Sequence, residues 1–389
     1  MSEFKLTTVE EMEAATNRLL ETGAKVGADA WQYRVKNQTP HCKFGETGVC
    51  CRICAMGPCR ITPKAPRGIC GCDVHGIVGR NYLKFTAGGA ATHSDHGREI
   101  CHTLYESAAD GDYKVKDPEK LIRIAKEWGI ETEGKDIYDL AHEVAYTGLM
   151  EYGKPFGYQR FMERLPEHTQ ELWKKNEIAP RAIDREVATS MHMTHMGCSS
   201  LPEALIKQSI RAGLCDGWGG SMMGTEFSDV LFGTPKPVDT EANLGVMNAD
   251  NVNIVVHGHD PSLSEMICEY ADDPEMIAYA KEMGAKGITV SGVCCTSNEV
   301  AMRRGIPMAG NFLQQETVVL TGACEAIVVD VQCIFPALGP LSKCFHTKFI
   351  TTSPVAQMPD SEFIRFNAKT AGENAKAIVK MAVENFNYR

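Results

Sequence analysis

Five cysteines lie within nineteen positions at residues 42–60, in the segment CKFGETGVCCRICAMGPCR. Three of them, together with Cys70, form the pattern C-x2-C-x4-C-x10-C, which comprises Cys51, Cys54, Cys59 and Cys70. Iron–sulfur clusters are held by four thiolates, several of which come from one tight loop. Structural zinc sites usually use two C-x2-C pairs, and this segment has only one. The spacing therefore favours an iron–sulfur cluster and leaves zinc as the alternative.

Cys42 and Cys50 lie outside this pattern, eight positions apart. Two thiolates make half of a four-thiolate site. In a twofold dimer each copy contributes the same pair at the symmetry axis, so two copies would complete the site. We therefore predict a homodimer bridged by a shared cluster. The alternative is that both thiols are buried and bind nothing.

Composition and charge exclude two classes of protein. The net charge of −10 over 389 residues argues against a nucleic-acid-binding surface. The chain also lacks the run of about eighteen apolar residues that predicts a membrane-spanning helix. The N-terminal segment has no apolar stretch typical of a signal peptide, so a cytoplasmic location is expected, where disulfides are disfavoured. The isolated cysteines are then predicted to be small buried side chains, namely Cys101, Cys198, Cys215, Cys268, Cys324 and Cys344.

The hydrophobic pattern changes along the chain. Residues 1–240 show mostly helical periodicity, and a Gly- and Pro-rich stretch at 214–245 indicates a boundary. Residues 241–389 alternate short apolar strands with helices, which predicts an α/β domain with a parallel, doubly wound sheet. The strands are predicted in VNIVVHGH, KGITVSGVCC, AIVVDVQC and KFITTS, and a long final helix is predicted over 361–386.

Metal-ligating residue types follow three of these strands. His257 and His259 end the first strand, Cys294 and Cys295 end the second, and Cys333 ends the third. Parallel sheets place their sites at the carboxyl ends of strands. The three strand ends are therefore predicted to bring soft or borderline metal ligands to one edge of the sheet.

Seven motifs follow one another along the chain: CKFGETGVCCRICAMGPCRI, RGICG, THSDHGREICH, FGTPKPV, HGHDPSLSEM, GVCCTSNE and VDVQCIFP. In these motifs the chain resembles the catalytic subunit of the anaerobic nickel–iron carbon monoxide dehydrogenases. This resemblance implies that Cys42 and Cys50 hold a D-cluster, of [4Fe–4S] or [2Fe–2S] type, shared across a homodimer. It also implies that the C-x2-C-x4-C-x10-C cysteines hold a [4Fe–4S] B-cluster, whereas Cys72 is not a ligand.

The resemblance further implies a nickel–iron–sulfur C-cluster that this chain ligates only in part, through His259, Cys295 and Cys333. His257 and Cys294 are then neighbours of the ligands. In the family a second Rossmann-like domain supplies the remaining ligands, and we expect it to be absent here, so that the chain is a fragment or split-gene product, or is completed by a partner polypeptide. The α/β domain predicted over 241–389 corresponds to the family's first Rossmann-like domain.

Three histidines occur in THSDHGREICH. A helix would spread His93, His96 and His102 over roughly 13 Å, a length suited to a proton relay. The resemblance implies this role, with His93 as the acid–base group nearest the C-cluster. The alternative is a polar helix face with unrelated histidines.

The resemblance predicts reversible oxidation of CO by water, with electrons leaving through iron–sulfur clusters to a ferredoxin-like acceptor. Acetyl-CoA synthase is a further expected partner. One alternative is a dimeric iron–sulfur electron-transfer or scaffold protein without CO activity. A relative of the hybrid-cluster reductases is another, which the paired cysteines and the motifs HGH and GVCC disfavour.

Overall fold

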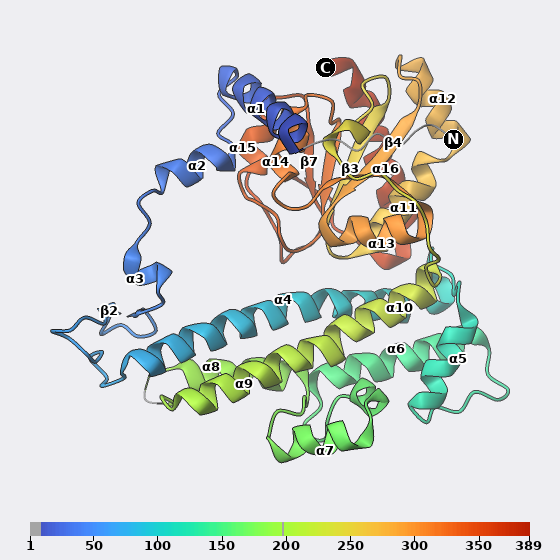
Figure 1. The fold of residues 1–389 in the computed structure, drawn as a ribbon. Helices are drawn as coiled ribbons and strands as arrows, with labels where there is room; N and C mark the ends of the chain where they lie inside the picture. The colour runs from blue at the N-terminus through green and yellow to red at the C-terminus, as the bar shows by residue number, and fades with distance from the viewer. Residues whose placement is uncertain (1–8, 197) are drawn as a thin grey trace. The chain divides into compact units, whose positions relative to one another are not determined.

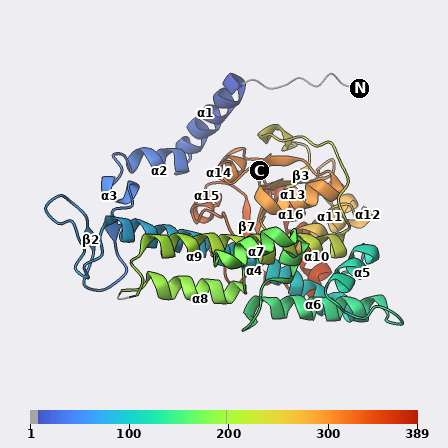
Figure 2. The same ribbon diagram turned by 60° about the horizontal axis from the view of Figure 1, so that its bottom comes forward.

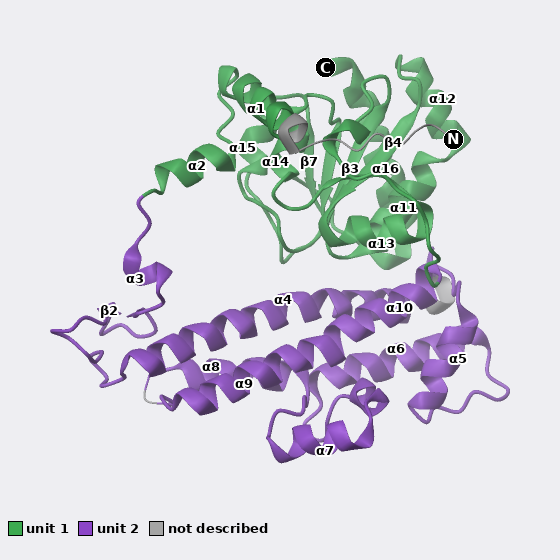
Figure 3. Ribbon diagram, viewed as in Figure 1, with its two compact units in different colours: residues 1–39, 234–389 green, residues 40–233 purple. Residues whose placement is uncertain are grey.

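The computed structural model describes residues 9–196 and 198–389. They form two compact units (Figure 3): a helical unit of residues 40–233, and a sheet unit of residues 9–39 and 234–389. The predicted fold class, a mostly helical part followed by an α/β part with parallel strands, is confirmed. No helix in the described residues is both long and apolar enough to cross a lipid bilayer.

The helical unit is organised around one long helix. Its elements are α3 (Lys43–Glu46), β1 (Cys50–Cys51), β2 (Cys59–Arg60), α4 (Val74–Asp110), α5 (Pro118–Glu127), α6 (Ile137–Gly153), η1 (Arg160–Arg164), α7 (Glu167–Lys175), α8 (Ile183–Thr194), α9 (Pro202–Cys215), η2 (Asp216–Ser221) and α10 (Met222–Phe232). Helix α4 packs against α6, α8, α9 and α10 (Figure 1). Asp73 caps α4 by accepting a hydrogen bond from Gly76 N at 2.9 Å. Buried small side chains at Ala87, Ala90 and Ser94 let neighbouring helices approach closely.

The sheet unit contains a six-stranded sheet in the order β5-β4-β3-β6-β7-β8. The strands are β3 (Val252–Gly258), β4 (Ile288–Val293), β5 (Met308–Gly310), β6 (Ala326–Val329), β7 (Lys348–Thr351) and β8 (Glu362–Phe363). Every pairing is parallel, and His257 at the end of β3 aligns with Val293 on β4 and Val329 on β6. Every residue of β3 is buried, as expected for the centre of a sheet covered on both faces.

Helices cover both faces of this sheet (Figures 1 and 2). The helices of the unit are α1 (Val9–Lys25), α2 (Trp31–Asn37), η3 (Leu244–Val246), α11 (Pro261–Ala271), α12 (Pro274–Glu282), α13 (Cys294–Arg304), α14 (Gln315–Leu320), α15 (Leu338–Ser342), η4 (Ala368–Thr370), α16 (Ala371–Asn385) and η5 (Phe386–Tyr388). Buried side chains of α1, α14 and α15 pack on one face with Val255, Ile327 and Phe349. The other face is covered by α11 and α16, which also contact each other.

The long helix predicted over 361–386 is wrong in its first third. Residues 362–363 form β8 at the edge of the sheet, and the α-helix begins only at Ala371. Ile364 N donates to Thr351 O at 3.0 Å, and Phe366 N donates to Thr352 O at 2.9 Å. Pairing with β7 therefore satisfies this backbone before the helix can start.

The Gly- and Pro-rich stretch at 214–245 is helical in its first half, through Phe232. Gly220 allows close packing, because a Cβ at this position would lie 2.4 Å from Ser94 Cα. The chain leaves the helix at Gly233, whose φ of 95° is a conformation that favours glycine.

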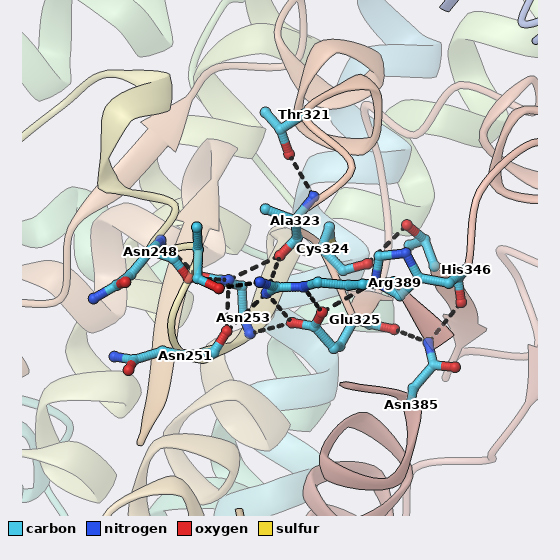
Figure 4. Close-up of polar contacts among 12 residues, drawn as sticks. Asn248, Asn251, Asn253, Thr321, Ala323, Cys324, Glu325, His346, Asn385 and Arg389 are labelled. Atoms are coloured by element: carbon cyan, nitrogen blue, oxygen red, sulfur yellow. Dashed lines mark hydrogen bonds and ion pairs between the residues drawn. The ribbon is translucent and has the colours of Figure 1, made fainter. Parts of the chain in front are cut away.

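A buried polar network stabilises the amino-terminal side of the sheet (Figure 4). The Glu325 carboxylate, directly before β6, is fully buried. It accepts hydrogen bonds from Arg389 Nε at 2.6 Å and Arg389 Nη2 at 3.0 Å. The backbone N–H of Asn253 donates to it at 2.6 Å, and His346 Nε2 lies 3.0 Å away. These contacts fix the start of β3 against the start of β6.

Candidate metal centre

The C-x2-C-x4-C-x10-C cysteines come together in a loop that precedes α4. Strands β1 and β2 pair antiparallel, with Cys51 opposite Cys59. A pocket in this loop is lined by all four predicted B-cluster residues, Cys51, Cys54, Cys59 and Cys70, and also by Cys72. Four thiols around one small pocket are the donor set that a [4Fe–4S] cluster uses.

The backbone around this pocket is shaped by glycines. A Cβ on Gly57 would lie 3.2 Å from Cys59 N, and one on Gly68 would lie 3.5 Å from Cys59 Sγ. The Ile69 N–H donates to Cys59 Sγ at 3.4 Å. Amides that point at cluster sulfurs stabilise the thiolate form and tune the potential of a bound cluster. The loop thus fits an iron–sulfur cluster in both its ligands and their surroundings.

Cys70 and Cys72 differ in their electrostatic surroundings. The backbone amide of Cys72 and the Arg80 guanidinium lower the pKa of Cys70. Burial instead raises the pKa of Cys72, which is 5% exposed. Arg80 Nε donates a hydrogen bond to Ser199 O at 2.8 Å, which fixes the guanidinium in place.

Cys42 and Cys50 lie close to this loop in the sequence and are accessible, Cys42 exposed and Cys50 half-buried. The backbone amides of Gly45 and Phe44 lower the pKa of Cys42. Asn81 Nδ2 on α4 donates to Gly48 O at 3.0 Å and to Cys50 O at 2.9 Å. The Cys50 segment is thereby fixed to α4.

In the described ranges, no three His, Cys, Asp or Glu side chains are grouped to hold a single metal ion.

The isolated cysteines fall into two groups. Cys101, Cys215, Cys268 and Cys324 are buried, as predicted. The prediction is wrong for Cys198, which is exposed, and Cys344 is only partly buried.

The second candidate centre lies at the carboxyl edge of the sheet. His259 follows β3, Cys295 follows β4 and Cys333 follows β6, and these three strands are neighbours with β3 in the middle. An isolated parallel bridge joins Gly258 to Cys294, which extends the β3–β4 pairing to the site. The sheet therefore brings the three strand ends to one edge, as the sequence predicts.

At this edge the backbone adopts conformations that residues other than glycine rarely adopt. Cys294, Gln332 and Cys333 have φ values of 66°, 69° and 58°. Such values cost free energy in non-glycine residues and cluster at functional sites. Burial raises the pKa of Cys294 to about 12 and also raises the pKa values of Cys295 and Cys333.

His257 and His259 have different surroundings. His257 is fully buried, and its Nε2 lies 3.1 Å from Gln315 Oε1. Gln315 Nε2 in turn donates to Cys333 O at 2.9 Å, so His257 supports the Cys333 turn through Gln315. Burial lowers the pKa of His257 to about 4, which keeps this ring neutral. His259 is held by its backbone N–H, which donates to Asp330 Oδ1 at 2.5 Å.

Gly258 makes the contact between Asp330 and the β3 turn possible. Its φ is 130°, and a Cβ there would lie 2.2 Å from Asp330 Oδ1. We expect Gly258→Ala to lower the free energy of unfolding by about 2–5 kcal/mol, because backbone strain and overpacking add. Gly284→Ala is the matched control, since Gly284 has a φ of 94° and no atom within 4 Å of its Cβ position. That control should cost about 1–2 kcal/mol. Denaturant unfolding of both variants measures the difference, and equal losses would contradict the steric account.

The three predicted relay histidines all lie on α4, but only two come together. The rings of His93 and His96 are 5.2 Å apart between centroids. His102 follows His93 by nine residues, or about two and a half helical turns, which places it on the opposite face of α4. Burial lowers the pKa of His96 to about 4.

Sequence reasoning missed the partner of His93. Asp216 is on η2, and its Oδ2 lies 3.0 Å from His93 Nδ1, although the two residues are 123 positions apart in the sequence. Hydrogen bonding to Asp216 raises the pKa of His93. In the sequence, Asp216 is the acidic residue that opens the glycine-rich segment DGWGGS, a composition that is typical of a boundary between domains.

The chain is similar to proteins of one family. The model of the Prismane/CO dehydrogenase family matches residues 49–389. Carbon monoxide dehydrogenase 1 of Methanosarcina mazei is 48% identical over 389 residues, which cover 98% of this chain and 62% of that protein. The as-isolated, nickel-free crystal structure of carbon monoxide dehydrogenase from Thermococcus sp. AM4 is 49% identical, with a TM-score of 0.93, and the match covers 96% of this chain and 60% of that one.

A further structure, of acetyl-CoA synthase/carbon monoxide dehydrogenase with NiZn[Fe4S4] and NiNi[Fe4S4] clusters in its alpha subunits, is 40% identical. Its TM-score is 0.92, and the match covers 96% of this chain and 56% of that one. The chain thus spans about 60% of the length of the relatives it matches.

Proposed function

Because this chain belongs to the Prismane/CO dehydrogenase family, we propose that it takes part in the oxidation of carbon monoxide by water, CO + H2O ⇌ CO2 + 2 H+ + 2 e−. The observation that carries the proposal is the sheet edge, where His259, Cys295 and Cys333 follow three neighbouring strands. We assign these three residues to a nickel–iron–sulfur C-cluster that they hold in part. When bound, this group would bind CO and accept its two electrons.

Electron transfer is assigned to the cysteine loop. Cys51, Cys54, Cys59 and Cys70 would hold a [4Fe–4S] B-cluster, because they line one pocket and the Ile69 N–H donates to the Cys59 sulfur. We propose a ferredoxin-like acceptor for the electrons, and acetyl-CoA synthase as a further partner. The setting proposed is an anaerobic cytoplasm, where such clusters are stable.

Proton transfer is assigned to His93. Oxidation of CO by water releases two protons for each CO, so a titratable acceptor is required. Asp216 orients the His93 ring and stabilises its protonated form. His96 is next to it but stays neutral near pH 7, because burial lowers its pKa to about 4. A proton route that includes His102 would have to cross from the face of α4 that carries His93 to the opposite face.

Metal content and CO activity test this function together. The chain, purified without oxygen together with the polypeptide that supplies the remaining C-cluster ligands, is expected to contain nickel and iron and to reduce methyl viologen only when CO is present. His93→Asn should slow this reduction by about 10²–10⁴-fold, which is the rate factor that acid–base catalysis usually contributes, and should leave the metal content unchanged. Iron without nickel, and no CO-dependent reduction, would favour the electron-transfer protein instead.

We also propose that two copies of the chain share a D-cluster. We expect a homodimer in which Cys42 and Cys50 of both copies hold one cluster. The double variant Cys42→Ser, Cys50→Ser should lose this cluster, about two irons per chain for a [4Fe–4S] type. Its dimer should also be weaker, so that in analytical ultracentrifugation it dissociates at higher protein concentrations than the dimer of the parent protein does. Cys198→Ser is the control, because Cys198 is exposed and lies outside both cysteine patterns. An unchanged iron content in the double variant would count against the shared cluster.

A further inference from the structure

A π-helical turn interrupts the helical segment that runs from Pro202 to Phe232. It is η2 (Asp216–Ser221), between α9 and α10. Its first residue, Asp216, lies 3.0 Å from His93 Nδ1, and its last residue, Ser221, places Oγ 2.9 Å from the same nitrogen. Residues five apart on an α-helix are rotated by about 140° and do not face one partner. The i→i+5 repeat of a π-turn brings such residues onto one face.

We propose that this π-turn is the positioning element of His93, with Asp216 and Ser221 together fixing Nδ1 and leaving Nε2 as the nitrogen that exchanges protons. The inference rests on the proposed proton-transfer role of His93. With Nδ1–H donated to an ionised Asp216, the neutral ring carries its acceptor lone pair at Nε2. The ring then gains and loses a proton at Nε2 without rearranging the contacts at Nδ1.

Two glycines allow the π-turn to approach α4 closely enough for these contacts. A Cβ on Gly220 would lie 2.4 Å from Ser94 Cα, and one on Gly97 would lie 2.2 Å from Gly220 O. Ser94, next to His93, also donates its Oγ–H to Asp216 Oδ1 at 2.8 Å. The Asp216 carboxylate is therefore held by two side chains of α4.

The charges around His93 agree with this arrangement. Two titratable groups contact its ring, Asp216 from η2 and His96 from α4. The hydrogen bond to Asp216 raises the pKa of His93. His96 is packed against Gly224 of α10 and remains neutral, so it adds no opposing charge near pH 7.

The imidazole C2 hydrogen–deuterium exchange rate of His93 tests the inference directly. Measured by peptide mass spectrometry from about pH 5 to about pH 9, it gives the pKa of this one ring without requiring CO activity. We expect the His93 pKa to fall toward its ordinary value in Gly220→Ala, because the new Cβ pushes η2 away from α4. Ser221→Ala should lower it in the same direction, and Ser221→Thr, which keeps the hydroxyl, should restore it.

Gly217→Ala is the matched control, because Gly217 lies in the same π-turn with no atom within 4 Å of its Cβ position. Its His93 pKa should equal that of the parent protein. If Ser221→Ala leaves the pKa unchanged, or Gly217→Ala shifts it as much as Gly220→Ala does, the inference is overturned. Since the readout is a pKa, a protein without CO activity would refute the proposed function and still test the π-turn.

Discussion

Cys59→Ala is expected to remove about four irons per chain and the visible absorbance of one [4Fe–4S] cluster. Cys59 lies opposite Cys51 on the paired strands, and its sulfur accepts the Ile69 N–H at 3.4 Å. It therefore joins the two halves of the loop that surround the pocket. Losing one of four thiolates leaves an iron with an open position, which destabilises the cluster. Iron and sulfide analysis of the anaerobically purified variant measures the loss.

Cys72→Ala is the control for this prediction. Cys72 lines the same pocket but stands outside the four-thiolate spacing and is buried. Its loss should leave the iron content of the B-cluster unchanged. If Cys72→Ala loses as much iron as Cys59→Ala, the assignment of the four ligands is wrong. If neither variant loses iron, the loop does not hold a cluster.

The parts of the molecule that the sequence predicts well are those governed by local patterns. The apolar run before His257 and His259 predicts β3 because a strand in the centre of a parallel sheet is buried on both sides. Residues that follow neighbouring parallel strands lie at the same edge of the sheet, so the strand assignments predict that His259, Cys295 and Cys333 lie at one edge. The cysteine loop is likewise local, since Cys51 and Cys59 are eight residues apart.

The parts that the sequence does not predict depend on contacts between distant residues. Asp216 contacts His93 only because a π-turn changes the register of a helix, and the glycines that permit it are typical of a loop. Strand β8 forms because β7 offers an unpaired edge, although residues 361–386 taken alone have helical periodicity. No local pattern distinguishes Glu325 from an exposed glutamate, yet it is fully buried.

Glu325→Ala is expected to destabilise the sheet unit by about 3–5 kcal/mol, the usual cost of removing one partner of a buried ion pair. The variant removes the carboxylate that accepts two hydrogen bonds from the Arg389 guanidinium. It also removes the acceptor of the buried Asn253 N–H. The affected groups join the starts of β3 and β6, so the loss falls on the centre of the sheet (Figure 4). For a unit of this size, the melting temperature should fall by roughly 10 °C.

Glu362→Ala provides the comparison on the same sheet. Glu362 pairs with Lys348 at 2.7 Å, but the two side chains are 46% and 42% exposed. An ion pair this accessible contributes about 0–1 kcal/mol, because water screens both charges. Thermal unfolding followed by circular dichroism should therefore separate the two variants by several degrees. Equal melting temperatures would show that the Glu325 network adds no more stability than a surface ion pair. A melting temperature of Glu325→Gln between those of the parent protein and Glu325→Ala would assign part of the loss to the charge. The remaining part would then belong to the hydrogen bonds that the amide oxygen still accepts.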